Sequence, residues 1–369
     1  MKRSHSVDAQ PGTISPVEAA QSITPDWLTR ALGAAGLDVV VSEVTATPIG
    51  TGQMSSCHRL AVRYASGEGP SSLVAKRALE NEARRLEVAR INETEVGFYR
   101  HLAPKLTIDV PQCWFAGLAR DGVEFTLLLE DVAPCRQGDQ IAGCSVEQAR
   151  AAVVNLAGLH GPSWCDSDLR SRTGLTFLGG RDPDNQGAEL QRVVQHLTPG
   201  FIERYRIPHQ DAEVLTAFAA NAAQLVSARR EPWALVHGDY RLDNLLFATN
   251  EGGRSCVAVD WQLTAVALPA RDVGFFVSTA LEPEERARCE RELVGAYHGA
   301  LINAGVDDCE FDRCWEDYRF GLFQSTMVTV TGAMFAPRTK RGDRMFQAMA
   351  RRSCAAIREL DAISLLEMV

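Results

Sequence analysis

The fold is decided by the stretch LVHGDYRLDNLLF at residues 235–247, together with VAVDWQ at residues 257–262. Both stretches contain apolar runs typical of short strands, and an Asn-Glu-Gly-Gly run between them is a hairpin signal. The polar residues among them include a carboxylate at Asp239, an amide at Asn244 and a second carboxylate at Asp260. Each has a fixed offset from a predicted strand, so we expect the three side chains to converge.

These three side chains suit phosphoryl transfer from a nucleotide. That reaction needs a carboxylate that orients or deprotonates the attacking hydroxyl, and oxygen ligands that hold Mg²⁺ against the phosphates. The alternative is structural, because Asp and Asn favour turns, and Asp239, Asp243 and Asn244 lie in a loop between strands. The upstream residues described below favour the functional interpretation.

The loop residues resemble the catalytic and metal motifs of the aminoglycoside phosphotransferase and choline kinase-like superfamily, small-molecule kinases with a protein-kinase-like fold. The chain is most similar to the ecdysteroid-kinase-like branch, over roughly residues 25–345, in four segments: 95–99 (EVGFY), 128–131 (LLED), 159–164 (LHGPSW) and 318–321 (YRFG). The resemblance implies that Asp239 is the catalytic base and that Asn244 and Asp260 hold Mg²⁺. It also implies ATP or GTP as the co-substrate.

The predicted fold class is α+β, a bilobal protein-kinase-like fold with a small β-rich N-lobe and a larger, mainly helical C-lobe. Residues 1–20 are polar and aperiodic and are predicted to form a tail. The N-lobe is assigned to residues 21–130, where β-rich runs surround one helical pattern. The C-lobe is assigned to residues 131–369, where helical patterns dominate.

A lysine and a glutamate in the N-lobe test this interpretation independently. Lys76 follows an apolar strand, where a kinase-like fold places the lysine that contacts nucleotide phosphates and pairs with a helix glutamate. Glu95 lies on the apolar stripe of a helix predicted within residues 80–102, and a carboxylate there is costly unless it is paired. We therefore predict a Lys76–Glu95 pair; the alternative is an exposed lysine at a strand end.

A Gly- and Ser-containing turn between the first two predicted strands resembles the loop that covers nucleotide phosphates. Gly50 and Gly52 permit close approach of the backbone, and Ser55 and Ser56 offer hydroxyl and N–H donors. The turn lacks the full G-x-G-x-x-G pattern, and a short glycine turn between strands is also an ordinary hairpin. Its position before Lys76 favours the nucleotide-binding interpretation.

Four further residues are expected to support the site. Glu130 and Val132 flank the predicted hinge, where the backbone would meet the adenine edge, and the Glu130 side chain is either solvated or a hydrogen-bonded connector. His237 is expected to brace the loop rather than to transfer protons. Asp272 lies at a predicted helix start, where the resemblance implies that its carboxylate caps N–H groups and braces the base loop.

Composition excludes several classes of protein. Of 369 residues, 38 are Lys or Arg and 47 are Asp or Glu, and the net charge of −9 argues against general binding of nucleic acids or anionic membranes. Ten cysteines lack the paired spacing of zinc sites and are expected to be buried thiols. No segment approaches the length of a membrane span, so we predict a soluble cytoplasmic protein whose partner is a small molecule.

The sequence thus predicts a kinase that phosphorylates a hydroxyl of a small molecule, with an antibiotic as the first candidate acceptor. Choline, a steroid-like alcohol or a sugar is the alternative acceptor, and a nucleotide-binding pseudokinase is the non-catalytic alternative. A protein kinase is disfavoured because Asp272 follows only twelve positions after Asp260, and a hydrolase because no G-x-S-x-G motif occurs. The residues expected to contact the acceptor are Trp315, Tyr318, Arg319 and Phe323, which equally suit a helix core.

Overall fold

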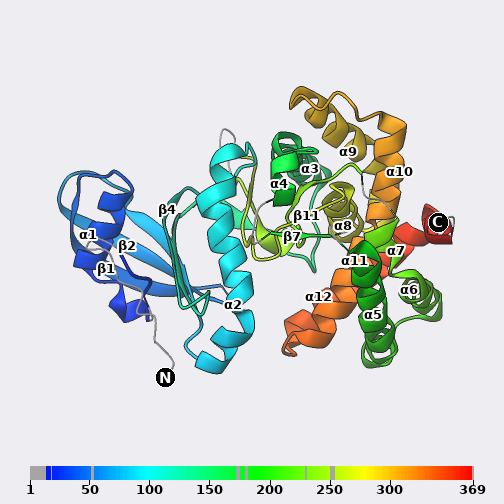
Figure 1. The fold of residues 1–369 in the computed structure, drawn as a ribbon, viewed down its shortest axis with the longest axis horizontal. Helices are drawn as coiled ribbons and strands as arrows, with labels where there is room; N and C mark the ends of the chain where they lie inside the picture. The colour runs from blue at the N-terminus through cyan, green and yellow to red at the C-terminus, as the bar shows by residue number, and fades with distance from the viewer. Residues whose placement is uncertain are drawn as a thin grey trace, which may run out of the picture. The chain divides into compact units, whose positions relative to one another are not determined.

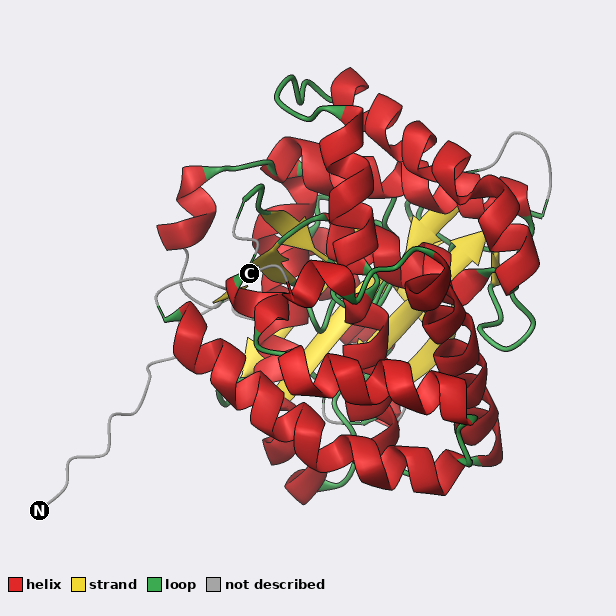
Figure 2. Ribbon diagram, turned by 90° about the vertical axis from the view of Figure 1, so that its right-hand side faces the viewer, coloured by secondary structure: helices red, strands yellow, loops and turns green. Residues whose placement is uncertain are grey.

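The computed structural model describes residues 14–17, 19–50, 54–171, 175–178, 182–228, 231–249 and 254–367. The chain forms two compact units: the first contains Met1–Arg100 and Pro111–Val132, and the second His101–Val110 and Ala133–Val369. The first unit is rich in β-sheet and the second is mainly helical, which confirms the predicted α+β fold class. Figure 2 shows how much of the described chain is helical.

The first unit is built on a five-stranded antiparallel sheet in the order β1-β2-β3-β5-β4. Its elements are α1 (Pro25–Ala34), β1 (Val40–Ile49), β2 (Ser56–Ser66), β3 (Ser72–Arg77), α2 (Glu82–Gly97), β4 (Cys113–Ala119) and β5 (Glu124–Glu130), with a short 3-10 helix at Ala20–Ser22. Both helices lie against this sheet in Figure 1, with α1 contacting β1 and β4, and α2 contacting β4 and β5. Each of the two helices thus covers part of the sheet. The predicted lysine, Lys76, lies on β3 of this sheet.

The core under α1 fixes the direction in which β3 presents its side chains. Trp27 and Leu28 of α1 pack with Leu73 and Ala75 of β3 in one buried cluster. Side chains alternate between the faces of a strand, so Lys76 points to the face opposite Ala75. Its neighbours in register are Cys57 on β2 and Leu127 on β5, which makes Lys76 a residue of an interior strand.

The predicted N-terminal tail is wrong for its last residues. Val17 is buried in the α1 cluster, and its N–H donates to Thr126 Oγ1 at 2.9 Å. The Ser15 carbonyl accepts a hydrogen bond from Trp27 Nε1 at 3.0 Å. Burial of apolar side chains such as Val17 and Ile14 therefore ties this segment to the first unit, whereas residues 1–13 lie outside the described residues.

The second unit contains most of the helices of the chain. The long ones are α3 (Val146–His160), α5 (Pro183–Tyr205), α6 (His209–Asn221), α8 (Ala270–Ala280), α9 (Pro283–Asn303), α10 (Phe311–Gly321), α11 (Phe323–Phe335) and α12 (Lys340–Glu359). The short ones are α4 (Ser167–Ser171), α7 (Gln224–Ser227) and α13 (Ser364–Glu367). A one-turn π-helix at Phe98–Leu102 and a 3-10 turn at Ala103–Lys105 lead from α2 into the second unit.

Two small three-stranded sheets lie among these helices. Their orders are β10-β9-β6 and β7-β11-β8. The strands are β6 (Arg136–Gln137), β7 (Thr176–Phe177), β8 (Ala234–Val236), β9 (Leu245–Phe247), β10 (Cys256–Ala258) and β11 (Ala265–Ala267). The predicted hairpin forms, since β9 and β10 pair antiparallel with Phe247 opposite Cys256, although its turn residues 250–253 lie outside the described residues.

Helix α8 is the centre of the second unit. All of its residues are buried, and it contacts α10, α11 and α12, which surround it in Figure 1. Gly274 of α8 faces the backbone of Gly321 in α10, so closely that a Cβ on either residue would overlap its neighbour. This close crossing fixes the position of α8. Asp272, in the first turn of α8, is thereby held next to His237, the residue that follows β8. Among the described residues, no helix combines the length and apolar character required to cross a membrane.

Candidate active site

The predicted lysine and glutamate form a buried ion pair in the first unit. Lys76 Nζ lies 2.7 Å from both carboxylate oxygens of Glu95. The two residues are 7% and 1% exposed, so the pair is almost wholly removed from water. Two other carboxylates of α2, Glu82 and Glu87, are exposed and pair with the exposed arginines Arg120 and Arg84. An ammonium held in this way keeps its orientation without a ligand.

The Gly- and Ser-containing turn before β2 is the second part of the nucleotide site predicted for the first unit. Gly50 has a φ of +73°, a backbone conformation that favours glycine, whereas Gly52 lies outside the described residues. Ser55 is buried, and Ser56 begins β2 and pairs with Arg77 of β3. These placements leave the role of the turn in phosphate binding as a prediction.

Glu130 at the end of β5 is a hydrogen-bonded connector. Its N–H donates to the Gln112 carbonyl at 2.8 Å, and its Oε2 accepts from the Gln112 N–H at 3.0 Å. The side chain is thus committed to the neighbouring segment. Val132 is half-buried two residues later, and a backbone contact of this stretch with a base stays a prediction.

In the second unit, the His-Gly-Asp loop is held by the carboxylate of Asp272. Its Oδ2 accepts the N–H of His237 at 2.6 Å, and its Oδ1 accepts the N–H of Gly238 at 3.0 Å. Asp272 is fully buried in the first turn of α8, where a carboxylate is also favoured by the helix dipole. This is the bracing geometry that the sequence predicts for Asp272.

His237 connects the loop to the segment that carries Asp260. Its Nε2 lies 3.0 Å from the Val259 carbonyl, and its Nδ1 lies 3.3 Å from the N–H of Asp239. Only one tautomer serves both contacts: Nε2 donates and Nδ1 accepts. The ring also packs on Trp261, with centroids 4.6 Å apart. Both ring nitrogens are therefore occupied, which suits bracing rather than proton transfer.

Gly238 is required by the backbone at this point. Its φ is +81°, and a Cβ there would lie 2.5 Å from the Leu263 carbonyl oxygen. Its own carbonyl accepts a hydrogen bond from Gln324 Nε2 at 2.9 Å, and Gln324 Oε1 in turn accepts from Arg271 at 2.6 and 2.8 Å. Burial lowers the pKa of Arg271 to about 10, although the charge of Asp272 acts against it. A buried chain of polar groups thus holds the loop from the α8 and α11 side.

The carboxylate of Asp239 is held by two side chains of the same loop. Asn244 Nδ2 donates to Asp239 Oδ2 and to its carbonyl, each at 2.9 Å. Arg241 Nε lies 3.1 Å from both carboxylate oxygens. Asp239 is only partly buried, with 19% of its side chain exposed, so an incoming group can still reach it.

Asn244 and Asp260 are the two residues predicted to hold a divalent cation. The Nδ2 of Asn244 is bonded to Asp239, which leaves its Oδ1 as the atom available to a cation. The Val259 N–H donates to the Asn244 carbonyl at 3.0 Å, so Asp260 follows directly beside Asn244. Asp260 itself has a φ of +69°, a strained conformation that is typical of functional sites.

The donor chemistry fits Mg²⁺ better than a transition metal. The described residues contain no cluster of three or more His, Cys, Asp or Glu side chains that could bind a metal. One carboxylate and one amide oxygen suit a cation that takes most of its other ligands from water and phosphates. The side chains of Asp239 and Asn244 meet as their spacing predicts, and the convergence of Asp260 with them stays a prediction.

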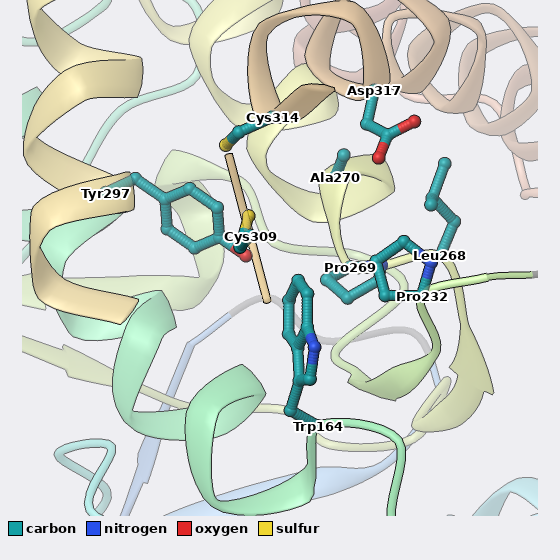
Figure 3. Close-up of a pocket in the computed structure, with 9 residues that line it drawn as sticks. All are labelled: Trp164, Pro232, Leu268, Pro269, Ala270, Tyr297, Cys309, Cys314 and Asp317. Carbon is teal, nitrogen blue, oxygen red and sulfur yellow. The ribbon is translucent and has the colours of Figure 1, made fainter. Parts of the chain in front are cut away.

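A small pocket lies on the other side of Asp272. His160 Nε2 is 3.4 Å from Asp272 Oδ2, and its Nδ1 is 2.7 Å from the hydroxyl of Tyr297. Tyr297 lines the pocket shown in Figure 3 together with Trp164 and Cys309, among others. The pocket contains none of the residues predicted to bind nucleotide, metal or acceptor.

The four residues predicted to contact the acceptor are used in the core and at a helix end instead. Tyr318 and Phe323 are fully buried, and the Tyr318 hydroxyl donates to Glu290 at 2.9 Å. Arg319 donates to the Leu360 carbonyl at the end of α12. Trp315 is half-buried against Tyr318. The prediction of an acceptor surface here is wrong for Tyr318, Arg319 and Phe323, because helical periodicity alone marks a core as readily as a site.

The residues that the sequence did not single out are Arg241, Gln324 and Arg271, each of which contacts the loop or its supports. Arg241 lies within the stretch at residues 235–247. Its positive charge two residues after Asp239 could have indicated a contact with that carboxylate. Gln324 and Arg271 come from distant helices, so only the fold reveals them.

The β-rich first unit, the helical second unit and the His-Gly-Asp loop define a kinase-like small-molecule phosphotransferase. The chain belongs to the ecdysteroid kinase-like family, whose model matches residues 50–307. This match confirms the family resemblance expected from the motifs. No curated protein matches the chain.

Solved structures give the same fold. The GDP complex of aminoglycoside 2'-phosphotransferase-IIIa is 15% identical, covers 89% of this chain and 98% of that chain, and has a TM-score of 0.55. The ethanolamine kinase of Plasmodium vivax is 12% identical, covers 84% and 81%, and has a TM-score of 0.51. The GDP and kanamycin complex of APH(2″)-IIIa is 14% identical, covers 90% and 94%, and also has a TM-score of 0.51. At these identities the likeness establishes the fold.

Proposed function

We propose that this protein transfers the γ-phosphoryl group of ATP or GTP to a hydroxyl of a small molecule. The observation that carries the proposal is the loop in which Arg241 and Asn244 hold Asp239, and in which the Asn244 backbone is bonded to Val259, the residue before Asp260. Membership of the ecdysteroid kinase-like family supports it. The GDP named for a similar structure supports a nucleotide co-substrate.

Each residue has a stated task in this proposal. Asp239 orients the acceptor hydroxyl and takes its proton, so that the oxygen can attack the γ-phosphorus as the bond to the β-phosphate oxygen breaks. Lys76, held by Glu95, binds the nucleotide phosphates in the first unit. His237 and Asp272 keep the loop backbone in place so that Asp239 needs no rearrangement before the reaction.

Asn244 Oδ1 and Asp260 would hold Mg²⁺. When bound, the cation supplies positive charge that neutralises the phosphates. Substituting Asp260 by Ala should therefore weaken binding of the Mg²⁺-nucleotide complex, whereas binding of nucleotide in EDTA should change little. Equal affinity of both proteins for the Mg²⁺ complex, measured by titration calorimetry, would count against the metal role of Asp260.

The acceptor belongs to the class of small hydroxylated molecules. An antibiotic is our first candidate, in line with the kanamycin named for one similar structure, and a metabolic alcohol is the second, in line with the ethanolamine kinase. Because Tyr318, Arg319 and Phe323 are committed to structure, we assign no acceptor contact to these three residues.

The experiment is a coupled assay of nucleotide consumption with Mg²⁺-ATP and Mg²⁺-GTP. The acceptors are aminoglycosides, macrolides, nucleoside antibiotics, choline, ethanolamine, sterols and sugars. Acceptor-dependent consumption would support the proposal and identify the acceptor class. Nucleotide-induced stabilisation without consumption would instead favour a nucleotide-binding protein without kinase activity, and the absence of both would overturn the proposal.

A further inference from the structure

Arg241 occupies the centre of a charged network in the second unit. Its Nε lies 3.1 Å from both oxygens of Asp239, and its Nη1 lies 2.8 Å from Asp243 Oδ2. Only 19% of the Arg241 side chain is exposed. The two carboxylates are thus held by one guanidinium whose planar group fixes them relative to each other.

Asp243 is itself fixed from two other segments of the second unit. Its Oδ1 accepts the N–H of Gln140 at 3.0 Å. Arg341 of α12 binds it through two nitrogens, Nη1 to Oδ2 at 2.8 Å and Nη2 to Oδ1 at 2.7 Å. Asp243 is 8% exposed, and such a two-nitrogen contact is geometrically restrictive. The first turn of α12 is therefore connected to Asp239 through Asp243 and Arg241.

Arg352 of the same unit divides its contacts between backbone and one carboxylate. It donates to the carbonyls of Gln140, Ile141 and Thr279, and to Glu282 Oε1 at 2.7 and 3.0 Å. Arg241, in contrast, contacts the side chains of Asp239, Asp243 and Met345. A guanidinium directed at the carboxylate of a proposed base limits the rotation of that carboxylate rather than holding a turn together.

We infer that Arg241 is a positioning residue for Asp239, and that Arg341 of α12 supports it through Asp243. The inference rests on the proposed function, because it concerns the orientation of the proposed base. A general base acts only when its oxygen lies within hydrogen-bond reach of the proton it removes. A misplacement of about 1 Å can reduce turnover on the order of 100-fold. Arg241 and Asn244 together restrict Asp239 before any acceptor binds.

The kinetic test compares Arg241→Gln, Arg241→Lys and Arg341→Gln with the wild type, using an acceptor that responds in the panel. Arg241→Gln should lower kcat by about 10- to 100-fold while the nucleotide KM changes less than about twofold. Arg241→Lys should recover part of kcat because it restores the charge. Arg341→Gln should lower kcat by about threefold, since it acts one contact further away.

The matched control is Arg344→Gln on the same helix. Arg344 is exposed one turn after Arg341, and its substitution should leave kcat unchanged. A kcat for Arg241→Gln within about twofold of the wild type would overturn the inference. The inference would also be overturned if Arg344→Gln lowered kcat as much as Arg341→Gln does. Equal losses would show a general effect of removing positive charge from α12.

A second measurement needs no acceptor. The melting temperatures of the wild type, Arg241→Gln, Asp239→Asn and the double variant form a thermodynamic cycle. If Arg241 holds Asp239, Arg241→Gln lowers the melting temperature less in the Asp239→Asn background than in the wild type. Equal decreases in the two backgrounds would overturn the inference. If the cycle shows coupling between Arg241 and Asp239 but the protein has no turnover, the positioning of Asp239 by Arg241 stands. Only the proposed function is then rejected.

Discussion

The two units hold their functional charges in different ways. In the first unit, Lys76 is held by an ion pair with Glu95, and both residues lie on regular elements, β3 and α2. In the second unit, Asp239 lies in a loop and is held by side chains of that loop, while the loop backbone is braced by Asp272 and Gln324. A single buried pair fails completely when one member is lost, whereas a network loses one contact at a time.

The largest effect on stability should come from the single pair. Lys76→Met should lower the stability of the first unit by about 3–5 kcal/mol, because it leaves the buried carboxylate of Glu95 without its partner. The double variant Lys76→Met, Glu95→Leu should regain most of that loss, since apolar residues replace the whole pair. Both variants should lose affinity for nucleotide.

Thermal unfolding and nucleotide titration would measure these changes. Lys105→Met is the control, because Lys105 is exposed and should affect neither quantity. If the single and double variants were equally stable, Glu95 would be satisfied by other groups and the contrast between the two units would fail.

The loop in the second unit should be sensitive to its backbone. Gly238→Ala places a Cβ 2.5 Å from the Leu263 carbonyl at a φ of +81°, so we expect a loss of about 1–3 kcal/mol in stability. Gly299→Ala in α9 is the matched control, because no atom lies within 4 Å of its Cβ position. That substitution should stabilise the helix slightly. Denaturant unfolding that ranked the two variants in the opposite order would reject the strain at Gly238.

The contact between α12 and Asp243 gives a pH-dependent prediction. Burial acts to raise the pKa of Asp243, but the hydrogen bond from Arg341 and the charge of Arg241 outweigh it and hold the pKa below the usual value of an aspartate. Asp243 therefore adds stability above about pH 4 that is lost as the pH falls through its folded-state pKa. Arg341→Gln should reduce stability at pH 7 by about 0.5–1 kcal/mol, since Arg341 is half exposed.

Unfolding of the wild type and Arg341→Gln at pH 7 and below pH 4 would measure this difference. The gap between the two proteins should shrink at the acid end, where Asp243 becomes protonated. A gap that is constant with pH would show that Arg341 does not act through the charge of Asp243.

An effect of similar size on stability, with none on acceptor binding, is expected at α10, where the sequence suggested an acceptor surface. Tyr318→Phe removes one hydrogen bond to Glu290, which keeps its contact with Arg286, and should cost about 1 kcal/mol. The KM for the acceptor should stay unchanged because Tyr318 is 1% exposed. An increase in acceptor KM with no change in melting temperature would restore Tyr318 as a contact residue.

The sequence was informative where function depends on residue type at a fixed local spacing. The spacing of Asp239 and Asn244 predicted that their side chains meet, and the apolar stripe of α2 predicted the pairing of Glu95 with Lys76. Both rest on rules that hold over a few residues, namely strand alternation, helix periodicity and the cost of an unpaired buried charge.

The supports of the loop depend on residues far apart in the chain. Gln324 and Arg271 reach Gly238 only because α8 and α11 pack together, and no local pattern marks either residue. The buried positions of Tyr318 and Phe323 illustrate the converse, because their helical spacing is the same for a core residue as for an exposed contact. Such assignments require the packing of the whole unit.

The central claim is that the carboxylate of Asp239 carries phosphoryl transfer. The most direct measurement compares wild type and Asp239→Asn for acceptor-dependent turnover and for the Kd of the Mg²⁺-nucleotide complex. We predict that kcat falls at least about 100-fold while Kd changes less than about threefold, because the substitution keeps the shape of the side chain and removes its basicity. Turnover close to that of the wild type in Asp239→Asn would contradict the account.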